Sequence, residues 1–262
     1  MPTTVSDVTF DPAVAMARQA LYRFTALTLL DPRFGSWEQL IVLRDDAILN
    51  EAVAVLCELP EAIPDELAPG EGSLAELDVS AVLAGLPDTY DEFNQHFENT
   101  FGLLVSNACP PYETEYIDSK FTFQRSHALA DISGFYSAFG VTPSVSHPER
   151  PDHIVQELEF MAFLIGLERQ ADAGDPLQRT ERLAICQEAQ VRFLREHLVW
   201  WVPAFAALLG REDTGGYYES AGKFLSALIT ADRALLGVPG WSHRPTPSDL
   251  EPPEACDGCG QL

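Results

Sequence analysis

Lysine and arginine are scarce in this chain of 262 residues. There are 16 of them against 40 aspartates and glutamates, which gives a formal net charge of −24. Between Arg44 and Lys120 there is no lysine or arginine, whereas 17 acidic residues lie there. Because such a surface repels phosphate backbones and anionic lipids, we expect neither nucleic-acid binding nor direct membrane insertion. The acidity would attract a basic partner, although acidity that only keeps the protein soluble explains the charge equally well.

Export and membrane signals are also lacking. The first ten residues contain Asp7 and neither a basic nor an apolar block, unlike a secretory signal. The longest apolar run, Leu198 to Leu209, has 12 residues and is interrupted by Pro203, short of the roughly 18 of a membrane span. Five cysteines, three of them isolated in the sequence, do not form a disulfide framework. We therefore expect a cytoplasmic protein in a reducing compartment.

Motifs of the common enzyme classes are missing. The chain has no Gly-x-Gly-x-x-Gly loop after a strand, no Walker-type phosphate loop and no Gly-x-Ser-x-Gly. A di-iron bundle would need two Glu-x-x-His pairs, and none is present. Glu92 and His96, and likewise His153 and Glu157, lie four residues apart, which is more typical of a surface hydrogen bond than of a metal site. We expect no enzyme activity, no catalytic residue and no residue that binds a cofactor.

Helical periodicity, in contrast, dominates the chain. Apolar residues recur every three or four positions from Pro12 to Leu30, and Asp31-Pro32 ends the run. Further helices are expected over residues 37–44, 47–58, 88–101, 121–139, 151–173, 176–200, 203–209 and 216–236. Three of them open on a proline, at 151, 176 and 203, where the missing amide is not needed. The pattern predicts one all-α domain over residues 1–237 and a flexible, proline-rich tail over residues 238–262.

The tail carries the only paired cysteines. Cys256 and Cys259 have Cys-x-x-Cys spacing, which is half of a metal site. Two interpretations stay open. The thiols are either adventitious groups on a mobile tail or part of a metal or cofactor relay completed by a partner, by His243 or by a second chain. No other metal ligand is assigned.

A connector between two expected helices is the first candidate recognition element. It runs from Leu103 to Asp118 and contains two consecutive prolines ending at Pro111, which hold the backbone extended. Tyr112, Glu113 and Tyr116 follow directly. These side chains either pack the connector onto the helices or line a groove for a peptide with apolar and basic side chains.

The second candidate element is Asp152-His153, at the start of the helix expected from Pro151. Asp152 is placed in the first helical turn, where the helix dipole favours an anion. One interpretation is a capping acid beside an exposed histidine. The other is a recognition point, in which Asp152 accepts hydrogen bonds from a guanidinium and His153 binds a peptide backbone.

The order of these segments along the chain resembles that in the TorD/NarJ/DmsD family of redox-enzyme maturation chaperones. The resemblance rests on the aromatic helix end from Phe97 to Phe101, on Pro-Pro-Tyr-Glu-Thr-Glu-Tyr at 110–116, and on Pro-Asp-His at 151–153 followed by Leu-Glu-Phe-Met at 158–161. Residues 18–22, 197–205 and 217–228 extend it to roughly residues 12 to 236. Thr114 stands where Ser is frequent and Tyr112 where some members have Trp, so the subfamily and the client stay open.

The resemblance implies a compact domain of about ten helices that acts as a dedicated chaperone. Family members bind the N-terminal leader, often a twin-arginine leader, and the apo form of the catalytic subunit of a molybdopterin-dependent oxidoreductase. They hold it until the cofactor is inserted, before export or membrane attachment. A member needs no cofactor of its own, although transient contact with the client's molybdenum cofactor is compatible with this role. A basic leader also suits the charge of −24.

We therefore expect leader binding in a groove near the aromatic helix end. The expected lining residues are Phe97, Phe101, Pro111, Tyr112, Glu113, Tyr116, Asp152 and His153. Two other functions remain open: an all-α metal-dependent hydrolase that uses Asp152 and His153, and an acidic adaptor that binds basic peptides without preference.

Overall fold

The computed structural model describes residues 10–44, 46–102, 108–117, 122–142, 144 and 149–242, and side chains of the helix beginning at Thr122 from Gln124 onward. Within these ranges the chain forms ten α-helices and no β-strand, which confirms the all-α class. They are α1 (Pro12–Leu29), α2 (Ser36–Leu43), α3 (Ile48–Cys57), α4 (Val79–Gly85), α5 (Tyr90–Phe101), α6 (Thr122–Ala138), α7 (Ile154–Asp172), α8 (Pro176–Phe193), α9 (Val202–Glu212) and α10 (Tyr217–Leu235). Shorter turns are η1 (Pro32–Phe34), η2 (Pro60–Ala62), η3 (Leu74–Glu76), η4 (Glu113–Tyr116) and the π-helical turn η5 (Leu194–Leu198).

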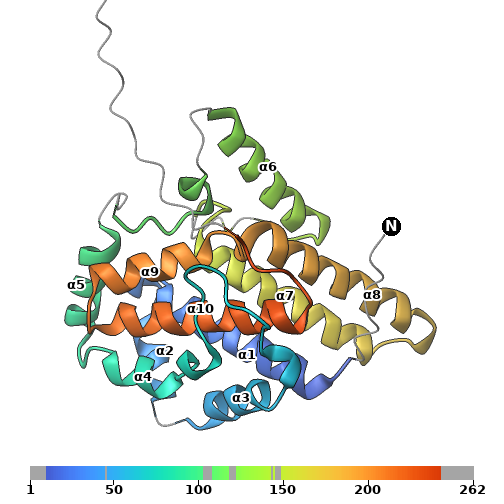
Figure 1. Cartoon of the computed structure of the whole chain (residues 1–262), viewed down its shortest axis with the longest axis horizontal. Coiled ribbons are helices and arrows are strands. Elements are labelled where there is room, and N and C mark those ends of the chain that lie inside the picture. The colour runs from blue at the N-terminus through green and yellow to red at the C-terminus, as the bar shows by residue number, and fades with distance from the viewer. Residues whose placement is uncertain are drawn as a thin grey trace, which may run out of the picture.

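Helices α1, α7 and α10 form the centre of the bundle. α7 packs against both α1 and α8, and α1 also packs against α3 and α10. α10 in turn contacts α9 and α4. Figure 1 shows α6 at one edge of the molecule, set apart from the main group of helices. Its Phe135 and Tyr136 contact Phe193 of α8, with ring centroids 5.4 and 6.3 Å apart.

Both ends of α1 follow from its sequence. Asp11 precedes the helix, and its carboxylate accepts hydrogen bonds from the backbone N–H groups two and three residues further on, at 2.8 and 3.4 Å. Pro12 occupies the first turn, where its missing amide costs nothing. The helix ends at Leu29, because Leu30 is extended and Pro32 opens the next turn.

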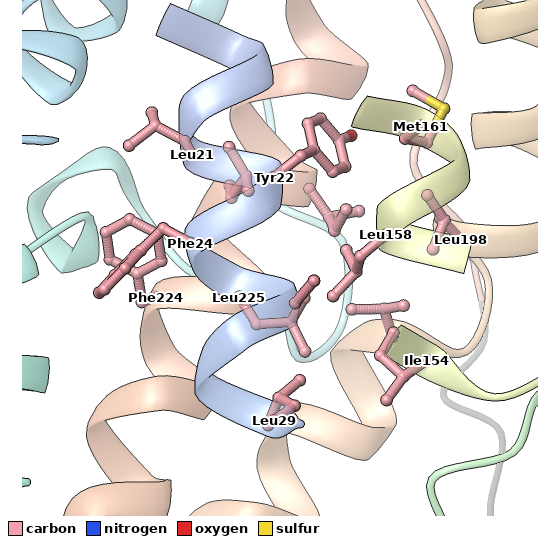
Figure 2. Packing of buried hydrophobic residues seen from close by; sticks show 14 of the residues in the cluster. Leu21, Tyr22, Phe24, Leu29, Ile154, Leu158, Met161, Leu198, Phe224 and Leu225 are labelled. Carbon is pink, nitrogen blue, oxygen red and sulfur yellow. The ribbon is translucent and has the colours of Figure 1, made fainter. Parts of the chain in front are cut away.

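The core lies where α1 meets α7 and α10 (Figure 2). Phe24 of α1 and Phe224 of α10 make an edge-to-face contact at 5.3 Å. The side chains labelled in Figure 2 expose 2% of their surface or less: Leu21, Tyr22, Phe24, Leu29, Ile154, Leu158, Met161, Leu198, Phe224 and Leu225. Burial of each large apolar side chain contributes roughly 1.5–3 kcal/mol, so this interface supplies much of the stability.

An ion pair is buried in the same interface. Arg18 of α1 donates two hydrogen bonds to the carboxylate of Asp232 in α10, and Tyr22 donates its hydroxyl to the same carboxylate at 2.7 Å. Burial, followed by the charge of Asp232, raises the pKa of Tyr22 well above its ordinary value, so the hydroxyl stays protonated and donates. Because the pair is buried, water could not compensate either charge if the other were removed.

The helical pattern in the sequence misses α4. This helix has seven residues, about two turns, which is too short for a 3.6-residue period to become visible. Asp78 caps it by accepting a hydrogen bond from the backbone N–H of Ala81 at 2.9 Å. Its buried Val79, Val82 and Leu83 belong to the common core, and the helix packs against α10.

The start of α7 also differs from the prediction. The helix begins at Ile154 instead of Pro151, and His153 is its N-cap. The prediction that Asp152 lies in the first helical turn is therefore wrong. The reason is a competing set of hydrogen bonds, because Asp152 and His153 are joined to the connector. Pro176 and Pro203 do lie in the first turns of α8 and α9.

Two further expectations on helix extent are wrong. The helix predicted from Pro176 to Trp200 is α-helical only to Phe193, after which η5 follows with an i→i−5 bond from Val199 N–H to the Leu194 carbonyl at 3.0 Å. The buried residues of this turn, Leu194, His197 and Leu198, still have three- and four-residue spacing in the sequence, so the pattern does not mark it. The connector, expected to be free of helix, contains the short turn η4.

The division into residues 1–237 and 238–262 stays a prediction. His243, Cys256 and Cys259 lie outside the described residues. Among the helices described, none is both long and apolar enough to cross a membrane.

Removing one partner of the buried ion pair should strongly destabilise the fold. We expect Asp232→Ala to lower the free energy of unfolding by about 3–5 kcal/mol, because it leaves the Arg18 guanidinium buried and unpaired. Denaturant titration followed by circular dichroism measures this loss. The control is Lys223→Ala, which removes an exposed ion pair with Glu219 on the same helix. A comparable loss in both variants would contradict the expected role of the buried pair.

Candidate functional site

The connector is hydrogen-bonded to the segment that leads into α7. Glu113 N–H donates to the Asp152 carbonyl at 2.9 Å, and the Pro111 carbonyl accepts from the first amide of α7 at 2.9 Å. These bonds flank an antiparallel bridge between Tyr112 and His153. The two candidate elements, distant in the sequence, therefore form one site.

Asp152 is the centre of this joint and is completely buried. Arg150 Nε and Nη2 donate to its two carboxylate oxygens at 3.0 and 2.8 Å. Thr114 donates its hydroxyl at 2.7 Å and its backbone N–H at 3.2 Å. Arg150 also pairs with Glu115 at 3.4 Å. A two-pronged guanidinium–carboxylate pair fixes distance and direction together, so the connector is held in one position.

The expectation that Asp152 accepts a partner's guanidinium needs correction, since Arg150 of the same chain already occupies that place. A partner's arginine would have to displace Arg150 from a charge-assisted pair whose carboxylate is buried. Asp152 therefore positions the residues around it and does not present its own carboxylate at the surface.

Tyr112 and His153 form the accessible part of the site. Both are half-buried, and their rings meet edge-to-face with centroids 5.2 Å apart. The Arg150 guanidinium lies 4.2 Å from the centre of the Tyr112 ring, and the Tyr112 hydroxyl donates to the exposed Glu149 at 3.4 Å. Burial, followed by the charge of Glu149, raises the pKa of Tyr112 to about 12, so the phenol stays neutral.

His153 is a neutral hydrogen-bond donor. Its Nδ1 accepts from the backbone N–H of Val155 at 3.2 Å, which assigns the proton of the neutral ring to Nε2. No described residue accepts a hydrogen bond from that Nε2. Burial lowers the pKa of His153 to about 4, so the ring carries no charge at neutral pH. The arrangement suits donation to the carbonyl oxygen of a peptide.

Two carboxyl groups are buried behind the bridge. Glu113 accepts from the indole N–H of Trp200 at 2.8 Å and lies 3.2 Å from His197 Nδ1. Burial raises the pKa of Glu113, although its contacts with His197 and Trp200 oppose this. Glu157 accepts from the indole N–H of Trp201 at 3.2 Å, and its other oxygen has no hydrogen-bond partner in the described structure. Burial, and then the charge of Glu113, raises the pKa of Glu157 well above its ordinary value.

Aromatic rings connect the site with the end of α5. Tyr116 contacts Trp201 at 5.1 Å, and Trp201 contacts Phe205 at 5.6 Å. Phe205 meets Phe101 at 6.5 Å, and Phe101 meets the partly buried Phe97 at 4.9 Å. This chain of contacts is interior packing, in which Tyr116 and Phe101 are buried. The predicted groove lining therefore needs correction at the buried residues Phe101, Pro111, Glu113, Tyr116 and Asp152, whereas Phe97, Tyr112 and His153 keep exposed surface.

A hollow of about 620 Å³ opens beside the start of α7. Val155 and Gln156, two and three residues after His153, belong to its wall. The remaining lining comes from α1, α2, α3 and α7 and is largely apolar: Ala20, Arg23, Phe24, Ala26, Leu27, Leu30, Gln39, Leu43, Leu49 and Glu159. Burial raises the pKa of Glu159. An extended peptide that passed His153 could place apolar side chains in this hollow.

Sequence reasoning did not find the groups that hold the site together. Arg150 lies two residues before Asp152 in the sequence, but only the structure shows that the two side chains pair. Glu157 follows Ile154 by three residues and precedes Met161 by four, so the sequence places it on the apolar face of the helix. This spacing could have indicated a buried carboxyl group. His197 and Trp201 are four residues apart among large apolar residues, which is a similar signal.

Comparisons with known proteins identify the family of this chain. Residues 65–207, more than half of the chain, match the family described as nitrate reductase delta subunit. The match includes the connector, the start of α7 and η5. The chain therefore belongs to this family, which confirms the resemblance to the TorD/NarJ group.

Individual relatives are similar over part of their length. The chaperone protein TorD of Aliivibrio salmonicida is 27% identical over 57% of this chain and 66% of its own length. The selenate reductase assembly chaperone protein of Thauera selenatis is 34% identical over 43% of this chain and 55% of its own. The chlorate reductase assembly chaperone protein of Ideonella dechloratans is 33% identical over the same shares. The chain thus spans between half and two thirds of the length of these relatives.

Loss of the Asp152 carboxylate should loosen the joint. We expect Asp152→Ala to lower the free energy of unfolding by about 1–3 kcal/mol, because four hydrogen-bond donors, two on Arg150 and two on Thr114, lose their acceptor while the freed guanidinium can still reach water. Thermal and denaturant unfolding measure the effect. Glu149→Ala is the matched control, since it removes an exposed carboxylate from the same segment and should change stability by less than about 0.5 kcal/mol. Equal stability of the two variants would contradict a structural role for Asp152.

Glu157 should make stability depend on pH. Because its pKa is raised in the folded state, the unfolded chain loses the proton first, and stability falls as pH rises from about 4.5 toward the folded pKa. Glu157→Gln keeps the acceptor for Trp201 and removes the titrating group, so the variant should lose less stability over this range. Unfolding titrations between pH 4.5 and 8 measure the slope, with Glu188→Gln at an exposed position as control. A slope identical to that of the unaltered protein would show that Glu157 does not titrate as argued.

Proposed function

We propose that this chain is a cytoplasmic assembly chaperone that binds the immature catalytic subunit of a molybdopterin-dependent oxidoreductase. Family membership supports this, as do relatives whose names describe assembly chaperones of selenate and chlorate reductases. The observation that carries the proposal is the joining of the connector and the α7 start into one fixed, half-exposed surface, which lies inside the matched region, beside an apolar hollow. Most of the hollow is lined by residues 20–49, which precede the matched region.

The client segment in this proposal is a basic N-terminal leader, of the twin-arginine kind in some clients, in extended conformation. A backbone carbonyl of the leader accepts from His153 Nε2, while its apolar side chains contact Tyr112 and enter the hollow. Glu149 at the rim and Glu159 in the hollow face its basic side chains. The net charge of −24 favours the encounter from a distance. The chain holds the client without transforming it and needs no cofactor of its own, although it can contact the client's molybdenum cofactor transiently.

The geometry favours this function over a hydrolase based on Asp152 and His153. Both oxygens of Asp152 accept from Arg150, and one also accepts from Thr114, so the carboxylate is engaged inside the fold. Nδ1 of His153 is likewise engaged as a helix cap. A scrambled leader peptide distinguishes the chaperone from an acidic adaptor without preference. The chaperone binds the leader more tightly than its scrambled sequence, whereas the adaptor binds both equally.

Replacement of Tyr112 should weaken leader binding without unfolding the protein. The probe is a synthetic leader peptide of the molybdoenzyme catalytic subunit that co-purifies with the chain, titrated by calorimetry. We expect Tyr112→Ala to raise the dissociation constant by about tenfold to thirtyfold, as for an aromatic anchor. Binding should also weaken as salt rises from 50 to 300 mM, because opposite charges are screened.

Tyr90→Ala is the matched control, because Tyr90 is also a half-buried tyrosine in an aromatic contact, with Trp37, but lies outside the site. It should leave the dissociation constant unchanged. Equal binding of the scrambled peptide would favour the adaptor. Binding that ignores both Tyr112→Ala and salt would contradict the proposed site.

A further inference from the structure

A second cluster of polar side chains lies where α6 meets η5. Asp131 of α6 and Glu196 and His197 of η5 bring one donor atom each to within 4.8 Å of one another. The His197 side chain is 3% exposed, and its Nε2 is buried without a hydrogen-bond partner. The nearest carboxylate oxygen, Oδ2 of Asp131, is 3.6 Å away. A buried ring nitrogen left unpaired costs about 1–3 kcal/mol, so its orientation needs a physical reason.

The opposite side of the imidazole fixes that orientation. Nδ1 of His197 faces both oxygens of Glu113 at 3.2 and 3.3 Å, and Glu113 is in turn held by the Trp200 indole at 2.8 Å. A proton on Nδ1, donated to Glu113, leaves the lone pair of Nε2 directed at Asp131. A carboxylate that binds one imidazole nitrogen while the other binds a metal is the usual arrangement around metal-ligating histidines.

The local backbone and the aromatic neighbours strengthen this placement. π-Helical turns are rare and occur frequently at functional sites, and η5 contributes two of the three donors. The rings of Phe135 and Phe193 lie 5.2 and 5.0 Å from the imidazole and restrict its rotation. The imidazole of His197 is therefore held in place before any ion binds.

We infer that Asp131, Glu196 and His197 bind a divalent transition-metal ion of the Zn²⁺ type, with Glu113 as the supporting carboxylate. One imidazole with two carboxylates suits Zn²⁺, whereas Mg²⁺ and Ca²⁺ prefer oxygen ligands alone. Zn²⁺ bonds of about 2.0–2.1 Å place neighbouring donors about 3.3 Å apart, close to the distance between His197 and Asp131. Glu196 is the weakest donor, because it also accepts from Arg192 and Arg195.

Such an ion would join α6 to the body of the bundle. None of the three proposed ligands belongs to the leader surface, although the supporting Glu113 also takes part in the joint with α7. The metal site goes beyond the proposed chaperone function, and either proposal can fail without the other.

Zinc titration of the full chain tests the inference. Cys256→Ser and Cys259→Ser are introduced first, so that tail thiols cannot bind the ion. In this background we expect one Zn²⁺ per chain, measured with a competing chromophoric chelator, and a rise in melting temperature with Zn²⁺ that Mg²⁺ and Ca²⁺ do not produce. His197→Gln and Asp131→Asn should each raise the dissociation constant at least tenfold, and Glu113→Gln about tenfold to a hundredfold.

His96→Gln is the matched control, because His96 also faces an aspartate, Asp213, at 3.9 Å. It should leave Zn²⁺ affinity unchanged. Asp131 is exposed, so Asp131→Asn keeps the fold even if His197→Gln does not. Absence of Zn²⁺ binding in the Cys-to-Ser protein, or binding unaffected by Asp131→Asn, would overturn the inference. Leader binding by Asp131→Asn then reports separately on the chaperone function.

Discussion

The pairing of Arg150 with Asp152 holds the connector against the start of α7 and thereby positions Tyr112 in the candidate site. One carboxylate holds the guanidinium and the hydroxyl of Thr114, and thereby ties the connector to the start of α7. The guanidinium also lies against the Tyr112 ring, whose hydroxyl contacts Glu149. Thus an ion pair made inside the chain, with its carboxylate buried, sets the direction of side chains that reach the surface. A stiff binding surface loses little conformational entropy when a flexible leader docks on it.

Glu113 belongs to both of the regions argued to bind other molecules. Its backbone N–H takes part in the joint with α7, while its side chain contacts His197 and Trp200. A movement of the connector would therefore change the environment of the imidazole, and an ion bound there would stiffen the connector in return. Binding at one region can therefore be coupled to binding at the other through this single residue.

Most of the fold could be predicted from the sequence, because long amphipathic helices are recognisable by the 3.6-residue period of their apolar side chains and by their capping residues. Helix α1 follows this rule from Asp11 to Leu30. Helix α4 is too short to show a period. The π-helical turn η5 cannot be recognised from the sequence, because its buried residues keep the three- and four-residue spacing of an α-helix. The sequence also drew attention to Tyr112 and His153, which the structure brings into contact.

The roles inside the site were harder to predict, because a charged residue does not reveal whether its partner belongs to the same chain. Asp152 suggested an acceptor for a foreign arginine, whereas Arg150, two residues away, fills that place. Asp131 and His197 lie far apart in the sequence and on different elements. Only three-dimensional proximity makes such a pair recognisable.

The short antiparallel bridge between the connector and α7 has a consequence for how this protein can vary. In an extended segment, successive side chains point to opposite sides, so Tyr112 faces outward while Glu113 is buried. Insertion or deletion of a single residue between Pro111 and Thr114 would exchange these two sides, bringing a phenol into the interior and exposing the carboxyl group. The number of residues in this stretch is therefore constrained more tightly than their amino-acid identity. The fold should tolerate substitutions there far better than insertions.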